Sequence, residues 1–203
     1  MYLNLNKSLI KLIIIFLVIS SASAQEKKEK ITDVENISAR NISWAILQTI
    51  PSVTWINDRN DINSRNAFGL KWNITPLNIS FSTNKFVSPV QFFMVNPMRK
   101  YTGSFEVFVQ PEWALTSLDY SGYDRFAVSA GGRINIPVKN YGEHLYVSLG
   151  GKYNFRNNSL TGKNGYYSIE GGMYVLFGIF GLTYNYNFDD RSKYSFGINF
   201  KYW

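Results

Sequence analysis

The chain has 203 residues, a formal net charge of +7, a single histidine and no cysteine. These counts exclude disulfide bonds and a lipid-anchored amino-terminal cysteine, and they argue against a transition-metal site, which draws its ligands from cysteine and histidine. The length is that of one domain. Apart from the pI of about 9.5, no feature supports the binding of nucleic acid.

The first 24 residues have the organisation of a signal peptide. Lys7 and Lys11 provide positive charge, residues 9–19 are otherwise apolar, and residues 22–24 form a cleavage site of small side chains. The alternative is a membrane anchor, but the apolar run is short for a helix that crosses a bilayer. We therefore expect residues 1–24 to be removed on export and residues 25–41, with four basic and four acidic side chains, to form a polar periplasmic lead-in.

Residues 42–203 contain eight segments that we predict to be strands, most of them with clear alternation of apolar and polar side chains. Several have the 9–11 residues that a tilted strand needs to cross a bilayer. Pro51 interrupts the first segment, and Pro76 predicts a bulge or bend in the second. The predicted strands are residues 42–55, 67–81, 103–115, 125–138, 143–155, 166–176, 179–188 and 193–203.

The connections between these segments are of two kinds. Two are short, at residues 139–142 and around Gly178, whereas four are polar and rich in Asn, Asp, Ser and Gly. In an up-and-down barrel the two kinds lie at opposite ends, with the polar loops extracellular and the short turns periplasmic. The polar loops are residues 57–66, 116–124, 156–164 and 189–192.

The connection at residues 82–102 breaks this pattern because it is about twenty residues long, holds two prolines and contains an apolar cluster. Connections of this length are uncommon in compact domains. Three interpretations are open: an extra strand pair in a ten-stranded barrel, an apolar segment at the bilayer interface, or a docking site for another protein. The residues that would form this interface are Phe86, Val90, Phe92, Phe93, Met94, Arg99 and Lys100.

The two faces of the predicted strands differ in chemistry. One is aromatic and aliphatic, without charge from Phe68 to Phe188. Since a Lys or Arg at mid-bilayer on a lipid face costs roughly 2–4 kcal/mol, we expect this face to meet lipid. A soluble barrel of the lipocalin type would have the faces reversed. However, the polar face mixes charges with Gly and Ser, which a narrow interior needs so that long side chains can pass one another. We predict an interior ion-pair network of Lys71, Glu106, Glu112, Arg125, Arg133, Lys152, Glu170 and Lys201.

The last ten residues form an apolar face that begins and ends with aromatic side chains. This ending resembles the carboxy-terminal strand of small bacterial outer-membrane β-barrel proteins of the eight-stranded class, in which the closing strand is also the insertion signal. It departs in one detail, because the final aromatic of that family is in phase with the apolar face. Here Trp203 lies one residue past the in-phase set, which is Tyr194, Phe196, Ile198, Phe200 and Tyr202.

Some small outer-membrane barrels modify lipids, which requires inward side chains that can cleave or transfer an ester. His144, Ser148 and Glu170 share the inward face and are the only weak candidates for ester cleavage. His144 and Ser148 are about 13 Å apart along one strand, beyond hydrogen-bond reach. We therefore expect no catalytic site, and neither metal nor cofactor.

The sequence thus predicts an all-β protein, a transmembrane antiparallel up-and-down barrel of eight strands, or ten, in the outer membrane of a Gram-negative bacterial cell. The expected function is a non-enzymatic structural or accessory-subunit role. The alternatives are a lipid-modifying enzyme, either an acyl hydrolase or an acyltransferase, and a narrow pore or small-molecule conduit. The expected partners are outer-membrane lipids, the barrel-assembly machinery during insertion, and another outer-membrane or periplasmic protein.

Overall fold

The computed structural model describes residues 49–81, 90–92, 103–139, 145–176 and 179–200, all within the compact unit Ile42–Trp203. The predicted signal peptide and polar lead-in lie outside the described residues. No helix in these ranges is long and apolar enough to cross a membrane.

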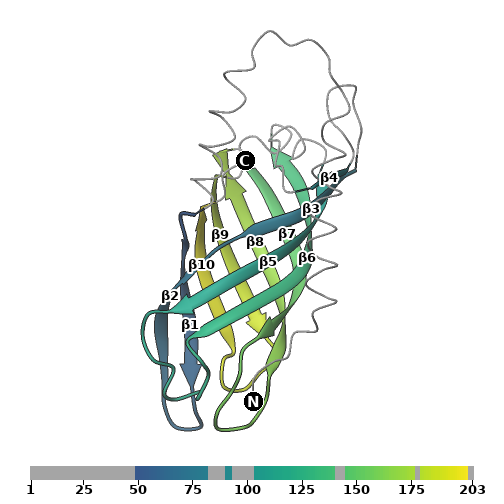
Figure 1. The fold of residues 1–203 in the computed structure, drawn as a ribbon. Coiled ribbons are helices and arrows are strands. Elements are labelled where there is room, and N and C mark those ends of the chain that lie inside the picture. The colour runs from purple at the N-terminus through teal and green to yellow at the C-terminus, as the bar shows by residue number, and fades with distance from the viewer. Residues whose placement is uncertain (1–48, 82–89, 93–102, 140–144, 177–178, 201–203) are drawn as a thin grey trace, which may run out of the picture. The chain divides into compact units, whose positions relative to one another are not determined.

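The described residues form a single antiparallel sheet (Figure 1). Its strands are β1 (Ser52–Arg59), β2 (Ser64–Lys71), β3 (Ile74–Ser80), β4 (Val90–Phe92), β5 (Ser104–Ala114), β6 (Phe126–Lys139), β7 (Leu145–Phe155), β8 (Gly165–Val175), β9 (Phe180–Asn187) and β10 (Tyr194–Phe200).

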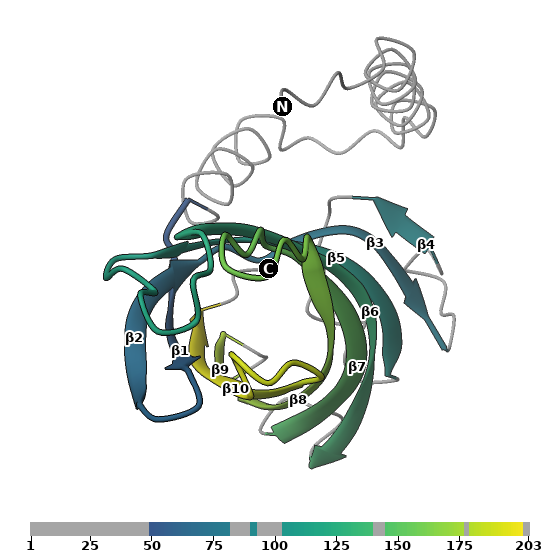
Figure 2. The same ribbon diagram turned by 90° about the horizontal axis from the view of Figure 1, so that it is seen from below.

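The sheet closes into an eight-stranded barrel (Figure 2). Strands β5 to β10 pair in sequence order, β10 pairs with β1, β1 with β2, and β2 with β5, which completes the ring. Strand β3 follows β2 along the same wall and also pairs with β5. The prediction of eight strands is confirmed.

The short strand β4 explains part of the long connection at residues 82–102. It pairs with β3, away from the ring, and adds no ninth position to the barrel. The register of β3 against β5 shifts between Ile74 and Leu77, which confirms the bulge predicted at Pro76. Proline lacks the backbone N–H that a ladder needs, so the pairing is interrupted there.

The first strand was predicted at residues 42–55, of which residues 42–48 lie outside the described residues, and its predicted end at residue 55 was wrong. Strand β1 begins after Pro51 and continues through polar residues to Arg59. The cause is a tight hairpin, in which Asn57 to Arg59 pair with Ser64 to Asn66. The Asn60 side-chain oxygen accepts hydrogen bonds from the backbone N–H groups of Ile62 and Asn63, at 2.9 and 2.6 Å, and closes the turn. Trp55 therefore lies within the strand and not at its end.

The two faces of the barrel wall are arranged as predicted. Charged side chains are buried inside, and Glu106 and Glu170 have no exposed surface. Apolar side chains face outward, so that Leu149 is 63% exposed and Met173 is 54% exposed. In β10 the outward Phe196 is 37% exposed, whereas its neighbour Ser195 is 8% exposed. A barrel with a charged interior and an apolar surface is the reverse of the usual soluble arrangement.

Glycines make room for the long interior side chains. Gly150 is the direct cross-strand partner of Arg133, and Gly131 is the partner of Lys152. A Cβ on Gly150 would lie 2.5 Å from the Arg133 Cβ and 2.9 Å from its Cα, a contact that only backbone movement can relieve. A Cβ on the outward Gly171 would meet nothing within 4 Å. The inward glycines therefore position the charged residues by their lack of a side chain.

We predict that Gly150→Ala destabilises the barrel by about 1–3 kcal/mol, the usual cost of overpacking a core. The control Gly171→Ala adds the same methyl group one strand away, where space is open, and should be neutral within about 0.5 kcal/mol. Urea unfolding of both variants in detergent micelles measures the difference. Equal stabilities would contradict the proposed crowding of the interior.

Candidate functional site: the polar interior of the barrel

The interior is built around Arg133, in the middle of β6. Its Nε donates to a Glu106 oxygen at 2.8 Å on β5, and its Nη1 donates to a Glu170 oxygen at 3.0 Å on β8. The other Glu170 oxygen accepts from Lys152 Nζ at 3.1 Å. All four side chains are at least 94% buried. This alternation of two cations and two carboxylates satisfies the requirement that a buried charge be paired.

A second set of contacts extends the network along β5 and to Asn73, which lies between β2 and β3. Lys152 also donates to the Gln110 oxygen at 2.9 Å, and the Gln110 amide donates to the Asn73 oxygen at 2.7 Å. Beyond the end of β7, Arg156 donates to a carboxylate oxygen of Glu112. Sequence analysis had placed Arg156 in a polar loop and missed it. The sequence did contain a signal for it, because Arg156 continues the alternating series of inward residues that includes Lys152 and Asn154.

Aromatic side chains fill the interior near the end that carries the β6–β7 and β8–β9 connections, called the turn end. The rings of Tyr146 and Tyr174 stack with centroids 4.7 Å apart and an interplanar angle of 3°. The Arg133 guanidinium lies 4.8 Å from the centroid of the Phe108 ring, a cation–π contact. All three aromatic side chains are buried. Tyr146 and Tyr174 lie toward the turn end from the ion-pair network, whereas Phe108 is level with it, opposite Gly131 on β6.

The opposite end, called the loop end, is closed by apolar residues and by the β5–β6 loop. Six buried side chains form a cluster there: Ile56, Ala67, Ala114, Leu118, Tyr123 and Tyr166. The loop is attached through the buried Asp58, whose oxygens accept from the Ser121 backbone N–H at 2.7 Å and from Arg65 Nε at 2.9 Å. Among the described residues, buried side chains therefore lie in the middle of the barrel and toward both of its ends.

Asp119 and Tyr123 are among the groups in the loops that have shifted pKa values. The pKa of Asp119 is lowered, first by the hydrogen bond from the Ser117 hydroxyl and then by the one from Arg65, since both stabilise the ionised carboxylate. The pKa of Tyr123 is raised, chiefly by burial and further by the negative charge of Asp189. Both shifts move the pKa further from neutral pH, so neither Asp119 nor Tyr123 is poised as an acid or base there.

Two of the predicted network residues that the structure describes, Arg125 and Lys71, are not ion-paired inside the barrel. Arg125 is exposed at the loop end, where its Nε and Nη2 donate to the carbonyl oxygens of Ala114 and Leu115 at 2.9 and 2.8 Å. Arg125 precedes the first residue of β6, so the alternation of that strand does not direct its side chain into the barrel. Lys71 is buried inside, but no carboxylate of the described residues lies within salt-bridge distance. Lys201 lies outside the described residues.

The candidate catalytic residues do not form a described site. His144 lies outside the described residues. Ser148 is buried on β7, opposite Gly172, and Glu170 is held between Arg133 and Lys152. A carboxylate between two cations is a poor proton acceptor, because the cations stabilise its ionised form. Among the described residues there is also no group of three or more His, Cys, Asp or Glu side chains that could hold a metal ion.

The predicted interface segment and insertion signal are described only in part. Within the segment, Val90 and Phe92 belong to β4, and Val90 is exposed. Tyr194, Phe196, Ile198 and Phe200 belong to β10, whose phase puts them on the outer face. The remaining residues of the two sets lie outside the described ranges: Phe86, Phe93, Met94, Arg99, Lys100, Tyr202 and Trp203.

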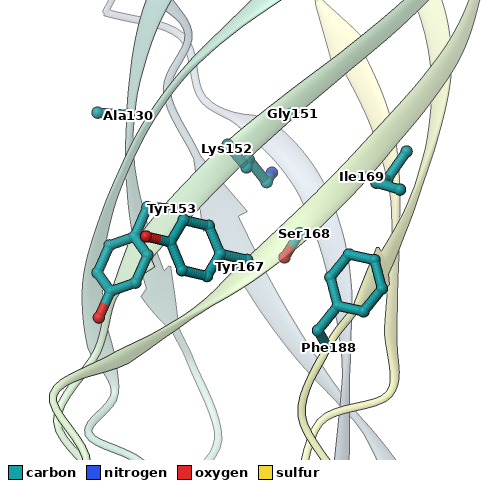
Figure 3. A pocket seen from close by; sticks show the side chains of 8 residues that line it. All are labelled: Ala130, Gly151, Lys152, Tyr153, Tyr167, Ser168, Ile169 and Phe188. Carbon is teal, nitrogen blue, oxygen red and sulfur yellow. The ribbon is translucent and has the colours of Figure 1, made fainter.

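The outer surface has an apolar hollow of about 550 Å³ over β6, β7 and β8. Figure 3 shows Tyr153 and Tyr167 together on one side, and Ile169 and Phe188 on the other. The two tyrosine rings meet edge to face with centroids 4.8 Å apart. A smaller polar hollow of about 230 Å³ lies in the loops, lined by Asn60, Asp61, Thr161, Lys163, Asp189, Asp190 and Arg191. The larger hollow contains no arrangement of acid, base and nucleophile.

Comparison of the chain with protein-family models, with curated proteins and with solved structures gave no match. The function is therefore argued from the geometry of the barrel.

We predict that Arg133→Ala destabilises the barrel by about 3–5 kcal/mol, because it leaves the carboxylates of Glu106 and Glu170 buried without this partner. The control Arg59→Ala removes an exposed arginine at the end of β1 and should change the free energy of unfolding by less than about 0.5 kcal/mol. Denaturant unfolding in micelles compares the two variants. A loss below 1 kcal/mol for Arg133→Ala would show that the network is not a main source of stability.

Proposed function

We propose that this protein is an integral β-barrel of the bacterial outer membrane with a non-enzymatic structural or accessory-subunit role. The observation that carries the proposal is the reversed distribution of polarity across the barrel wall. Arg133 and Glu170 are buried in the interior, while side chains such as Leu149 and Met173 are more than half exposed on the outside. Lipid is the solvent that suits such a surface.

The extent of the outer apolar surface supports this reading. Water-soluble proteins rarely expose continuous apolar patches of more than a few hundred square ångströms. Here every strand from β5 to β9 contributes exposed apolar side chains, and they line neighbouring strands without an intervening charge. Examples are Trp113, Ile134, Leu149, Ile169 and Leu182.

Aromatic side chains near the loop end support the same reading. Outward rings contact one another in pairs at the strand ends that carry the polar loops: Trp113 with Phe126, Tyr153 with Phe155, and Tyr186 with Phe188. Aromatic side chains concentrate where a membrane protein crosses the interface between lipid and water. With the polar loops outside the cell, this belt lies at the outer interface.

The filled interior favours a structural role over transport. A conduit needs a continuous space through the barrel, but ion pairs occupy its middle, the Tyr146–Tyr174 stack lies toward the turn end and apolar residues close the loop end. Catalysis is disfavoured because both Glu170 oxygens are engaged by cations. Outer-membrane lipids are the proposed surroundings, the barrel-assembly machinery is the partner during insertion, and the connection 82–102 is the proposed contact for another membrane or periplasmic protein.

The experiment is affinity purification of the full chain from its native membrane in mild detergent, followed by mass spectrometry of associated proteins and by conductance recording in planar bilayers. We expect a membrane-derived complex whose partner is lost when residues 86–97 are deleted. We also expect no stepwise conductance, because the interior side chains leave no open path.

Two results would count against the proposal. Recovery of the mature chain in the soluble fraction without detergent would remove the membrane assignment. Steady conductance, or a change in lipid acylation that depends on His144, would favour the conduit or the enzyme.

A further inference from the structure

Apart from Asp58 and Asp189, which pair with Arg65 and Lys163 at the loop end, the charged side chains inside the described barrel fall into two groups with different balance. The group around Arg133 contains two cations and two carboxylates, each joined to a partner of opposite sign. The second group surrounds Glu112 and contains two cations, Lys71 and Arg156, but one carboxylate. The second group therefore carries one positive charge in excess.

The excess charge is located on Lys71. The side chain is 1% exposed, and its ammonium nitrogen is buried without a hydrogen-bond partner. Its cross-strand neighbour is Glu112, but the Glu112 carboxylate is bonded to Arg156. Arg156 itself has two buried nitrogens, Nε and Nη1, without partners. By contrast, the unpartnered Nη2 of Arg133 belongs to a guanidinium that lies over the Phe108 ring.

A second donor lies next to the Lys71 ammonium, in front of Gly197 on β10. A Cβ built on Gly197 would lie 3.4 Å from Lys71 Nζ and 3.0 Å from the Thr183 hydroxyl oxygen, so both groups border the space that the missing side chain of Gly197 leaves. The Thr183 oxygen accepts a hydrogen bond from the Asn199 amide at 2.7 Å, which leaves the hydroxyl proton to be donated. The Val53 carbonyl oxygen is 3.3 Å from the same Cβ and would repel an anion there, which shifts the favoured position toward the ammonium.

We propose that the barrel interior binds one small monovalent anion of the halide class between Lys71 and Thr183, in front of Gly197. Transfer of an isolated ammonium group from water into a protein interior is costly unless it is paired, and the carboxylates in reach are already engaged. The site requires a small ion, because the neighbouring strands are close-packed around it. The proposal rests on the interior charges and does not depend on the membrane assignment.

The test uses chloride as the probe and the full mature chain in detergent micelles. We expect the melting temperature to rise with chloride when gluconate is replaced at constant ionic strength. A ligand that binds only the folded state stabilises it in proportion to the logarithm of its concentration, so a tenfold rise above the dissociation constant raises the melting temperature by roughly 3–5 °C. Bromide soaked into crystals should give an anomalous peak next to Lys71 Nζ.

Three variants make the result specific. Lys71→Met removes the cation and should abolish the chloride dependence, while Lys163→Met, which removes a cation with a 63% exposed side chain, should retain it. Gly197→Ala keeps the cation but fills the proposed position, so the dependence should be lost even if Lys71→Met does not fold. The proposal would be overturned if the wild-type melting temperature did not change with chloride, or if its dependence on chloride survived in Gly197→Ala. It would also be overturned if crystals showed only a water molecule beside Lys71.

Discussion

The structure depends on the pairing of oppositely charged side chains that are buried inside the barrel. Arg133 contacts two carboxylates on two other strands, and one of them, Glu170, also binds Lys152. Strands β5, β6, β7 and β8 are thereby linked through side chains as well as through backbone hydrogen bonds. Because an unpaired buried charge is costly, this network favours one register of the strands over its alternatives.

The same constraint explains why small residues are placed where they are. A long charged side chain can cross the barrel only where the neighbouring strand gives it room, and Gly150 and Gly131 lie directly opposite Arg133 and Lys152. Toward the turn end, Tyr174 lies against Gly181 and stacks on Tyr146. Glycine weakens a strand on its own, but here it allows the interior contacts that hold the barrel together. The outward faces are free of this constraint and are apolar.

Much of the fold was predictable from the sequence, because alternation has a period of two in any strand with two different surroundings. The alternation predicted the bounds of the later strands to within a few residues and identified the apolar and polar faces of each. It failed at the first strand, where the polar residues Asn57 to Arg59 belong to a hairpin that alternation does not reveal. It also failed at Arg125 and Arg156. Each lies beside the end of a strand, where a shift of one residue in the alternation changes whether a side chain points to solvent or to the interior.

The choice of ionic partners was beyond sequence reasoning for a different reason. The predicted set included five of the eight buried charged side chains among the described residues and missed Asp58, Arg156 and Asp189. Which cation meets which carboxylate depends on strand register, and register was unknown. The same holds for Lys71, whose neighbour Glu112 is engaged by an arginine that had been assigned to a loop. Function was less predictable still, since no residue set in the described barrel has the geometry of a known kind of catalytic site.

The central claim is that the apolar face of the barrel wall meets lipid, and adjacent residues on β7 test it most directly. The chain has no cysteine, so Ser148→Cys and Leu149→Cys each introduce a single site for a spin label. In reconstituted bilayers we expect the label at 149 to be accessible to oxygen dissolved in lipid and shielded from a water-soluble nickel complex. The label at 148 should be shielded from both. Ready access of the nickel complex to position 149 would contradict the account.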